Sequence, residues 1–346
     1  MQTVLITGGA GFFGGVLKRK MLGEGYRCVS FDLVQDADRH ENLVSIQGDL
    51  RDKALVEEVF STYQFSAVQH CAAMLAHGLK IDEAEVWNCN VEATRNVAEA
   101  CKRHQVRNLI FTSTNCLWAS NLGHAIAEDE PPAPVEVYGR AKLESERVLR
   151  EYSGELNVVI IRCPTIIDSG RLGLLAILFE FIDDNKTVWL VGGGSNRYQF
   201  IYADDLAQAC EQAMELGRSE TFHIGSDHVE SLREVFEAVI RAAGSKSKTR
   251  ALPKGPAILA MKLAHHLHIS PLGAYHYKMI AEDFFFDTTR IKRELHWQPT
   301  LSNSQMLVRA YQYYSTHRAE IEKRSDVSAH SKPASMGIIR LLKWIS

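Results

Sequence analysis

The chain opens with Met1-Gln-Thr-Val-Leu-Ile-Thr-Gly-Gly-Ala-Gly-Phe-Phe-Gly14, a short apolar run that ends at a cluster of glycines. The spacing of Gly8, Gly11 and Gly14 lets the backbone turn tightly, approach a pyrophosphate and begin a helix whose N-terminal amides bind the anion. A second apolar run follows and ends at Asp32. A carboxylate there accepts hydrogen bonds from both ribose hydroxyls of a dinucleotide and repels a 2′-phosphate. The pattern therefore predicts a dinucleotide site that favours NAD over NADP.

Apolar runs alternate with amphipathic helical stretches along the first half of the chain. After the strand at the N-terminus, a helix over 16–22 and a strand over 27–31, further strands are expected at 43–47, 67–72, 108–112 and 158–162, with helices at 53–63, 83–103 and 137–152. Such alternation places parallel strands in one sheet and helices on both of its faces. The sequence predicts an α/β fold of the Rossmann type, a doubly wound parallel sheet, with a smaller C-terminal substrate-binding lobe.

The pattern loosens beyond Pro164 and suggests three parts in the chain. We expect an NAD-binding core over 1–165, with some strands of its sheet lying beyond it, and a substrate-binding lobe over 166–320 that is interleaved with the core. Residues 321–346 are expected to form a linker and an amphipathic tail. The later elements are expected as helices at 172–182 and 204–216, a glycine turn at 192–194, strands at 200–202 and 221–224, and a surface loop at 244–250.

The composition is that of an ordinary soluble protein with reduced thiols. The chain has 346 residues and 46% hydrophobic content, which is enough to bury a large core. Its net charge of −3 gives no basic field for nucleic acid. Its seven cysteines lack paired metal-ligand spacing, and adjacent histidines at 265, 266 and 268 point in different directions on a helix, so no metal site is expected. The N-terminus shows no leader and no apolar run is long enough to span a membrane, which indicates a cytoplasmic protein.

The C-terminal tail leaves two interpretations open. Over 336–346, Arg340 and Lys343 share one side of a helix, while Ile338, Leu341, Leu342 and Ile345 share the other. Such a tail suits a peripheral contact with a membrane interface, and it equally suits docking on the protein itself or on a partner subunit.

Tyr138 and Lys142 form the only Tyr-x-x-x-Lys in the chain and share one face of the expected helix. A neighbouring ammonium favours the phenolate, so Tyr138 could take a proton from a hydroxyl while hydride leaves the same carbon, and return it in reverse. Ser113 and Thr114 follow the strand before this helix, and their hydroxyls could hold the substrate oxygen near the phenol.

Together with these residues, several longer motifs make the chain similar to the extended short-chain dehydrogenase/reductase family. They are Thr7-Gly-Gly-Ala-Gly-Phe-Phe-Gly14, His70-Cys-Ala-Ala73, Asn90, Thr112-Ser-Thr114, Tyr138-Gly-Arg-Ala-Lys142, Arg162-Cys-Pro164, Gly194-Ser-Asn-Arg-Tyr-Gln-Phe-Ile-Tyr-Ala-Asp-Asp205 and Leu295-His-Trp-Gln-Pro299. The resemblance covers the chain to about Pro299. It implies an NAD-dependent enzyme of the epimerase/dehydratase type, and a homodimer formed through helices 83–103 and 137–152.

The resemblance also implies roles for individual residues. Thr114, Tyr138 and Lys142 correspond to the catalytic triad, with Lys142 also on the nicotinamide ribose. The implied cofactor set is Gly8, Gly11, Phe12, Phe13, Gly14, Asp32, Asp49, Leu50, Cys71, Ala72, Ala73, Asn90, Thr112, Tyr138, Lys142, Cys163 and Thr165. The implied substrate contacts are Met74, Thr114, Arg171 and Arg197, the last as a partner for a diphosphate.

Two departures from the family pattern bear on the reaction. Sugar 4,6-dehydratases carry Asp-Glu after the catalytic threonine, whereas this chain has Asn115-Cys116, which disfavours elimination. Cys116 stands where GDP-fucose synthases carry a proton-moving cysteine, so it is a candidate acid/base, with packing as the alternative role. Arg197 is displaced by one residue from the family's arginine, and Tyr198 stands at the usual position.

Three functions remain open from the sequence. The first is an oxidoreductase or epimerase that acts on a nucleoside-diphosphate sugar through a transient keto intermediate. The second is a dehydrogenase of a sterol-like or lipid alcohol, suggested by the aromatic, arginine-poor stretch Tyr275–Phe286. The third is a non-catalytic NAD sensor, which would need none of the groups of Thr114, Tyr138 and Lys142.

Overall fold

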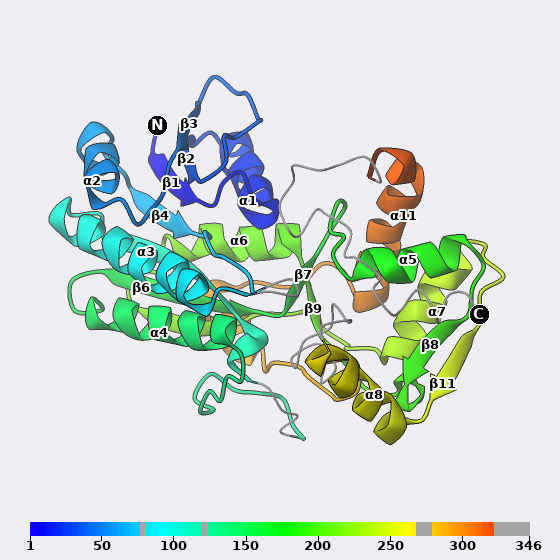
Figure 1. Ribbon diagram of the computed structural model, residues 1–346. Helices are drawn as coiled ribbons and strands as arrows, with labels where there is room; N and C mark the ends of the chain where they lie inside the picture. The colour runs from blue at the N-terminus through cyan, green and yellow to red at the C-terminus, as the bar shows by residue number, and fades with distance from the viewer. Residues whose placement is uncertain (77–80, 119–122, 268–278, 322–346) are drawn as a thin grey trace.

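The computed structural model describes residues 1–76, 81–118, 123–267 and 279–321, and its centre is a seven-stranded sheet (Figure 1). The strand order is β3-β2-β1-β4-β5-β6-β10, and every neighbouring pair is parallel. The strands are β1 (Thr3–Thr7), β2 (Arg27–Asp32), β3 (Leu43–Gln47), β4 (Ala67–His70), β5 (Asn108–Thr114), β6 (Asn157–Cys163) and β10 (Glu220–His223). The expected doubly wound parallel sheet is confirmed.

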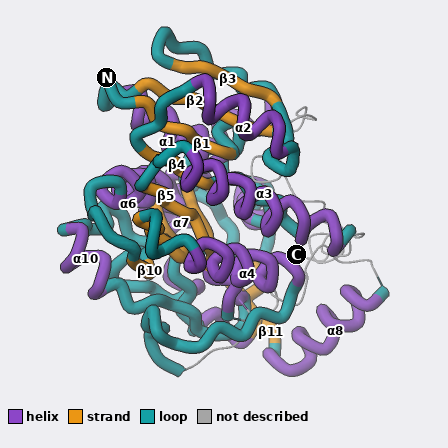
Figure 2. The backbone as a smooth tube through the Cα atoms, turned by 90° about the vertical axis from the view of Figure 1, so that its left-hand side faces the viewer, coloured by secondary structure: helices purple, strands orange, loops and turns teal. Residues whose placement is uncertain are grey.

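Helices cover both faces of this sheet. On one face, α1 (Phe12–Gly23) packs against α6 (Ala203–Ala213), and α10 (Thr289–Leu295) lies beside α6 and β10. On the other face, α2 (Lys53–Thr62), α3 (Glu83–Arg103) and α4 (Val137–Glu151) lie side by side, as both views show (Figure 2). The chain thus returns to the central sheet after residue 165, with α6, β10 and α10.

The alternation of side chains along each strand explains why both faces need helices. Val4 and Ile6 of β1 belong to the hydrophobic cluster beneath α1 and α6, whereas Leu5 belongs to the cluster beneath α2 and α3. A strand whose successive residues are all apolar must be covered on both sides, because successive side chains point to opposite faces.

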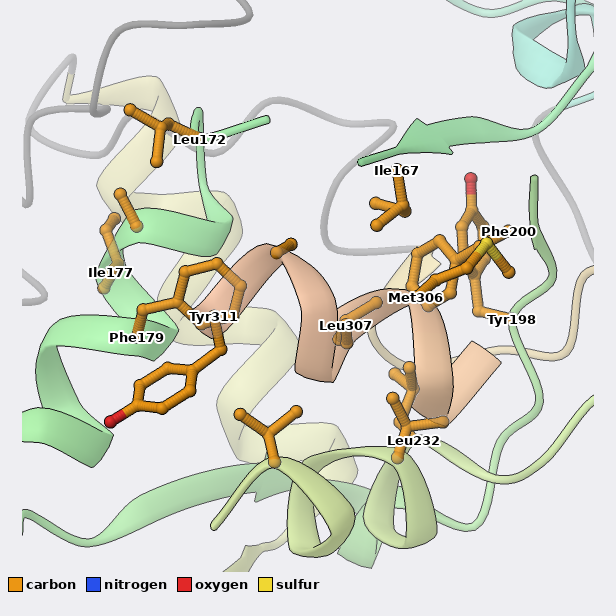
Figure 3. Packing of buried hydrophobic residues seen from close by; sticks show 14 of the residues in the cluster. Ile167, Leu172, Ile177, Phe179, Tyr198, Phe200, Leu232, Met306, Leu307 and Tyr311 are labelled. Atoms are coloured by element: carbon orange, nitrogen blue, oxygen red, sulfur yellow. The ribbon is translucent and has the colours of Figure 1, made fainter. Parts of the chain in front are cut away.

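The remaining elements build a second lobe around its own core (Figure 3). Two short parallel sheets join β7 (Thr165–Ile167) to β9 (Phe200–Tyr202) and β8 (Val188–Val191) to β11 (Thr249–Leu252). The helices are α5 (Leu175–Asp183), α7 (Leu232–Ala242), α8 (Lys254–His266) and α11 (Asn303–Ile321), with short 3₁₀ turns η1 (Asn115–Leu117) and η2 (Gly192–Gly194). Phe179, Met306, Leu307 and Tyr311 show how α11 inserts its apolar side between α5 and α7.

The second lobe also contains the main differences from the sequence expectations. The stretch 244–250 is not wholly a loop, because Thr249 and Arg250 begin β11, which pairs with β8. Helices α7, α8 and α11 and strand β8 were not among the expected elements. The amphipathic tail over 336–346 and most of the expected linker lie outside the described residues. Within the described part of the chain, no helix is long and apolar enough to cross a membrane.

A buried histidine connects the first strand to the helix layer. His70 Nδ1 lies 2.7 Å from Thr7 Oγ1, and His70 Nε2 lies 2.9 Å from Thr94 Oγ1 on α3. Burial, with a smaller contribution from the Lys142 ammonium, lowers the pKa of His70 to about 3. His70 is therefore a neutral link between β1, β4 and α3.

This link predicts a specific pH dependence of stability. Between pH 6.5 and pH 3 the unfolded chain protonates His70 and the folded chain does not, so the free energy of unfolding falls as the pH falls. The contribution approaches about 1.4 kcal/mol per pH unit. His70→Gln removes it, so the stability difference between wild type and variant should shrink from pH 6 to pH 4 in urea unfolding. The exposed His40→Gln serves as the control, and an unchanging difference for His70→Gln would contradict this role.

Candidate active site

A cavity of about 510 Å³ opens at the carboxyl ends of β1, β2, β4, β5 and β6. Parallel sheets bind their ligands at this edge. Of the expected site residues, all but Asn90, Lys142 and Arg197 line it. Those that line it are Gly8, Gly11, Phe12, Phe13, Gly14, Asp32, Asp49, Leu50, Cys71, Ala72, Ala73, Met74, Thr112, Thr114, Cys116, Tyr138, Cys163, Thr165 and Arg171.

The glycine turn forms one wall of the cavity and is closely packed. Gly8 has φ +71°, a conformation that favours glycine, and its amide donates to Phe31 O at 2.9 Å. A Cβ on Gly14 would lie 2.1 Å from Gly8 O, so α1 can start this close to the turn only with glycine there. Gly11, the N-cap of α1, provides no side-chain cap, and the first turn holds no acidic residue. Backbone amides at this helix start therefore suit a pyrophosphate.

Asp32 connects the glycine turn to the loop that follows β2. Its Oδ2 accepts a hydrogen bond from Ala10 N at 3.1 Å, and its Oδ1 accepts one from Val34 N at 3.1 Å. These bonds fix the carboxylate at the end of β2, beside the cavity. This placement fits the expected contact with the adenosine ribose.

An ion-pair cluster that the sequence interpretation missed lies next to the expected adenine contact. The Arg51 guanidinium donates to both oxygens of Asp49, from Nε to Oδ1 at 3.0 Å and from Nη2 to Oδ2 at 2.6 Å, and reaches Glu85 Oε2 at 2.8 Å. The hydrogen bonds from Arg51 lower the pKa of Asp49. The sequence neighbour Leu50 is buried and lines the cavity. Arg51 thus links this corner of the site to α3. In the sequence, only the spacing of Asp49 and Arg51, two residues apart, could have indicated this ion pair.

Tyr138 stands in the first turn of α4 and lines the cavity opposite the glycine turn. The next residue brings it there, because a Cβ on Gly139 would lie 2.3 Å from Cys116 O, so that α4 packs directly on η1. Burial raises the pKa of the Tyr138 phenol, while a hydrogen bond with Thr114 and the positive charge of Arg171 lower it. In the structure the phenol is therefore the protonated, neutral form.

Lys142 lies one turn further along α4 and is buried behind the cavity wall. Its Nζ donates to Thr112 O at 2.7 Å and lies 3.7 Å from the centre of the Phe111 ring. Burial lowers the pKa of this ammonium to about 8, so it remains mostly charged at neutral pH. The cation is held by the backbone of β5, in the layer beneath Tyr138.

The two hydroxyls after β5 have different partners. Ser113 Oγ donates to Glu146 Oε1 at 2.6 Å, within a buried cluster in which Arg162 also binds Glu146. Ser113 also lines the cavity, but its hydroxyl proton is donated to this buried carboxylate, so its contact with a substrate oxygen stays a prediction. Thr114 Oγ1 accepts from Cys116 N at 3.1 Å and hydrogen-bonds Tyr138, and Thr114 lines the cavity beside the phenol.

The expected substrate residues divide between the cavity and the surface. Arg171 lines the cavity, with its guanidinium carbon 6.0 Å from the centre of the Phe12 ring. Arg197 does not line it. Its guanidinium lies 4.6 Å from the Phe285 ring, and its amide donates to Asp283 at 2.7 Å. Tyr198 is buried, with its hydroxyl 2.6 Å from Asn115 Nδ2.

Asn90 acts on the cavity through another residue. From α3, its Nδ2 donates to Met74 O at 2.9 Å and its Oδ1 accepts from Met74 N at 3.1 Å. The pair of bonds holds the segment after β4 in an extended form, and Met74 lines the cavity. Asn90 is thus a positioning residue in this structure.

Comparison with known proteins identifies the family. A model of the NAD dependent epimerase/dehydratase family matches residues 4–225. The chain is also 32% identical over 346 residues to the uncharacterized protein y4nG of Sinorhizobium fredii, covering 99% of this chain and 86% of that protein. This chain belongs to the NAD dependent epimerase/dehydratase family. It is accordingly an enzyme of the extended short-chain dehydrogenase/reductase type, and its cofactor is NAD.

Two further comparisons are with UDP-glucose 4-epimerases. The chain is 26% identical over 280 residues to UDP-glucose 4-epimerase of Halalkalibacterium halodurans, covering 73% of this chain and 84% of that one. The crystal structure of UDP-glucose 4-epimerase from Thermotoga maritima with UDP-glucose superposes with a TM-score of 0.76 at 23% identity, covering 92% of this chain and 100% of that one. The second likeness is one of fold.

The packing of Gly14 gives a direct test of the cofactor cradle. Gly14→Ala should raise the Kd for NAD at least about tenfold, because the new Cβ forces α1 away from Gly8. Gly23→Ala, at the other end of α1, meets no atom within 4 Å and should leave NAD binding unchanged. Calorimetric titration with NAD measures both. Equal affinity for the two variants would show that the turn does not hold the pyrophosphate.

Proposed function

We propose that the enzyme oxidises a secondary hydroxyl of a nucleoside-diphosphate sugar to a ketone and reduces it again from the other face, giving an epimer. The observation that carries the proposal is the placement of Tyr138 and Thr114 at one cavity with the glycine turn, above the buried Lys142. Bound NAD would accept and return the hydride. The residues of the chain bind the sugar, orient its hydroxyl and move its proton.

Tyr138 is the proposed acid/base of both half-reactions. Thr114 orients the hydroxyl, and Tyr138 takes its proton as the carbon is oxidised, then gives a proton back on reduction. Because burial raises the pKa of the phenol, a nearby positive charge is needed to favour the phenolate. The Arg171 guanidinium lowers the pKa of the phenol, and we assign the same effect to the Lys142 ammonium, one turn along α4, whose own pKa is about 8.

The geometry after Thr114 supports epimerisation over elimination. Asn115 donates its amide to Tyr198 Oη at 2.6 Å, and an amide neither takes nor gives a proton near neutral pH. Cys116 is half-buried, lines the cavity and lies close enough to Tyr138 to affect its pKa. A ketone acidifies the C–H bond beside it, and we assign Cys116 as the group that would exchange this proton with solvent while the ketone is present, a side exchange that inversion of the oxidised carbon does not itself need.

The substrate class rests on the relatives and on Arg171. The family members named above act on UDP-glucose by their names, and Arg171 can bind a diphosphate oxygen. Arg171 is, however, the single cation among the described lining residues, which favours a less anionic alcohol as the second candidate. Its other support is weaker, since Phe284 and Phe286 pack in the core of the second lobe. Tyr275 lies outside the described residues.

Replacement of Tyr138 by phenylalanine tests the proposal. Tyr138→Phe should keep NAD affinity and lower the rate of epimer formation by about 10²–10⁴-fold, because the variant lacks the acid/base. The rate is measured by NMR on UDP-glucose, UDP-arabinose and dTDP-glucose, with Tyr152→Phe, at the far end of α4, as the matched control. A Tyr138→Phe protein with wild-type turnover would exclude the mechanism. The sensor would be favoured if neither the wild type nor Tyr138→Phe turned over these sugars, while Tyr138→Phe still bound NAD and kept its biological activity.

Cys116→Ala tests the proton exchange beside the ketone apart from the hydroxyl chemistry of Tyr138. This variant keeps Tyr138, so the hydroxyl should still be oxidised, whereas solvent deuterium should no longer enter the carbon beside the ketone. Unchanged deuterium incorporation would remove Cys116 from the mechanism and leave it a packing residue.

A further inference from the structure

Helix α8 lies at the edge of the second lobe and is only shallowly attached to it (Figures 1 and 2). Of its described side chains, only Ala264 is buried, and Ala257, Ile258 and Met261 are half-buried. At 100° per residue these four positions fall on one side of the helix. This side faces the protein.

The opposite side of α8 is also apolar. Leu259, Leu263 and Leu267 follow one another at i, i+4 and i+8, so they form one row, and they are 69%, 58% and 55% exposed. A surface helix ordinarily turns a polar face to water. The other large exposed apolar side chains of the described residues, such as Ile81 and Val135, lie on other elements. The leucine row is thus an exposed apolar patch that packing does not explain.

The chain around this row is strongly basic. Residues 238–281 contain seven lysines and arginines and no aspartate or glutamate, although the whole protein has a net charge of −3. The described members that precede the row in sequence or lie within it are Lys246, Lys248, Arg250, Lys254 and Lys262, all exposed. None of these five forms an ion pair with another described residue. The charges therefore face solvent: Lys254 and Lys262 lie on α8, Arg250 lies on β11, and Lys246 and Lys248 lie in the segment before β11.

We propose that α8 docks on an anionic lipid surface. The leucine row would enter the boundary between headgroups and acyl chains, and the five cations would lie over the anionic headgroups. An apolar face and a cationic cluster supply the two contributions that interfacial binding needs, and each is weak alone. Charge complementarity selects this occupant over a second copy of the chain, since two such basic faces repel each other. The proposal is independent of the alcohol that the cavity oxidises.

Flotation of the full-length, NAD-loaded protein with vesicles tests the surface. The wild type should float with phosphatidylcholine vesicles that contain phosphatidylglycerol, weakly with pure phosphatidylcholine, and less at high salt. Leu259→Ser/Leu263→Ser/Leu267→Ser should lower binding at least about tenfold. Lys254→Glu/Lys262→Glu should remove the preference for phosphatidylglycerol. The control is Ile81→Ser/Val135→Ser, which removes exposed apolar groups elsewhere and should bind as the wild type does.

Several results would overturn the proposal. Equal binding of the leucine variant and the wild type, with NAD affinity and Tm unchanged in both, would show that the row takes no part. A truncated chain that ends at Lys332 and no longer floats would assign the membrane contact to the tail. A wild type that does not float, but whose oligomeric state changes in the leucine variant, would make the row a protein interface. A wild type that binds RNA in place of vesicles would make the basic stretch a nucleic-acid surface.

Discussion

The close approach of α1 to the turn at Gly8 is the contact on which the rest of the site depends. Gly14 allows the helix to begin directly over the Gly8 carbonyl, where any larger residue would collide. The turn also packs closely against the segment that follows β4, since a Cβ on Gly8 would lie 2.8 Å from Ala72. The cofactor wall is therefore built from backbone, which gives it a fixed position relative to β1, β2 and β4.

The cofactor wall and the proposed catalytic groups share one buried support. His70 hydrogen-bonds Thr7, the residue just before the turn, and stacks on Phe111 at 5.4 Å. The same Phe111 ring lies 3.7 Å from Lys142 Nζ, which is anchored on Thr112 O. Because α4 also packs on η1 through Gly139, Tyr138 and Thr114 are set against the same frame. A displacement of the cofactor wall would therefore also displace the proposed catalytic groups. Proton and hydride transfer need these two parts of the site in a fixed relative position.

The sequence predicted what local pattern can encode and missed what depends on distant contacts. The glycine spacing, the apolar strands of the central sheet and the Tyr138–Lys142 pair are encoded within short stretches of sequence, and they lie on the expected elements of the structure. The hydrogen bond of Ser113 with Glu146 could not be predicted, because the two residues are 33 positions apart. Helix α8 was not predicted, because it is apolar on two sides and its sequence shows no single apolar stripe. The hydrogen bonds between Asn90 and the backbone of Met74 have no pattern in the nearby sequence that could predict them.

The most direct test of the account is the thermal stability of the NAD-loaded protein against a panel of nucleoside-diphosphate sugars, free sugars and steroid or lipid alcohols. Ligands that bind the folded state raise the Tm by mass action, so the measurement assumes no reaction. The account predicts a rise confined to one family of nucleoside-diphosphate sugars and lost in Arg171→Met. A rise with apolar alcohols alone would contradict the proposed substrate class and assign the cavity to lipid oxidation.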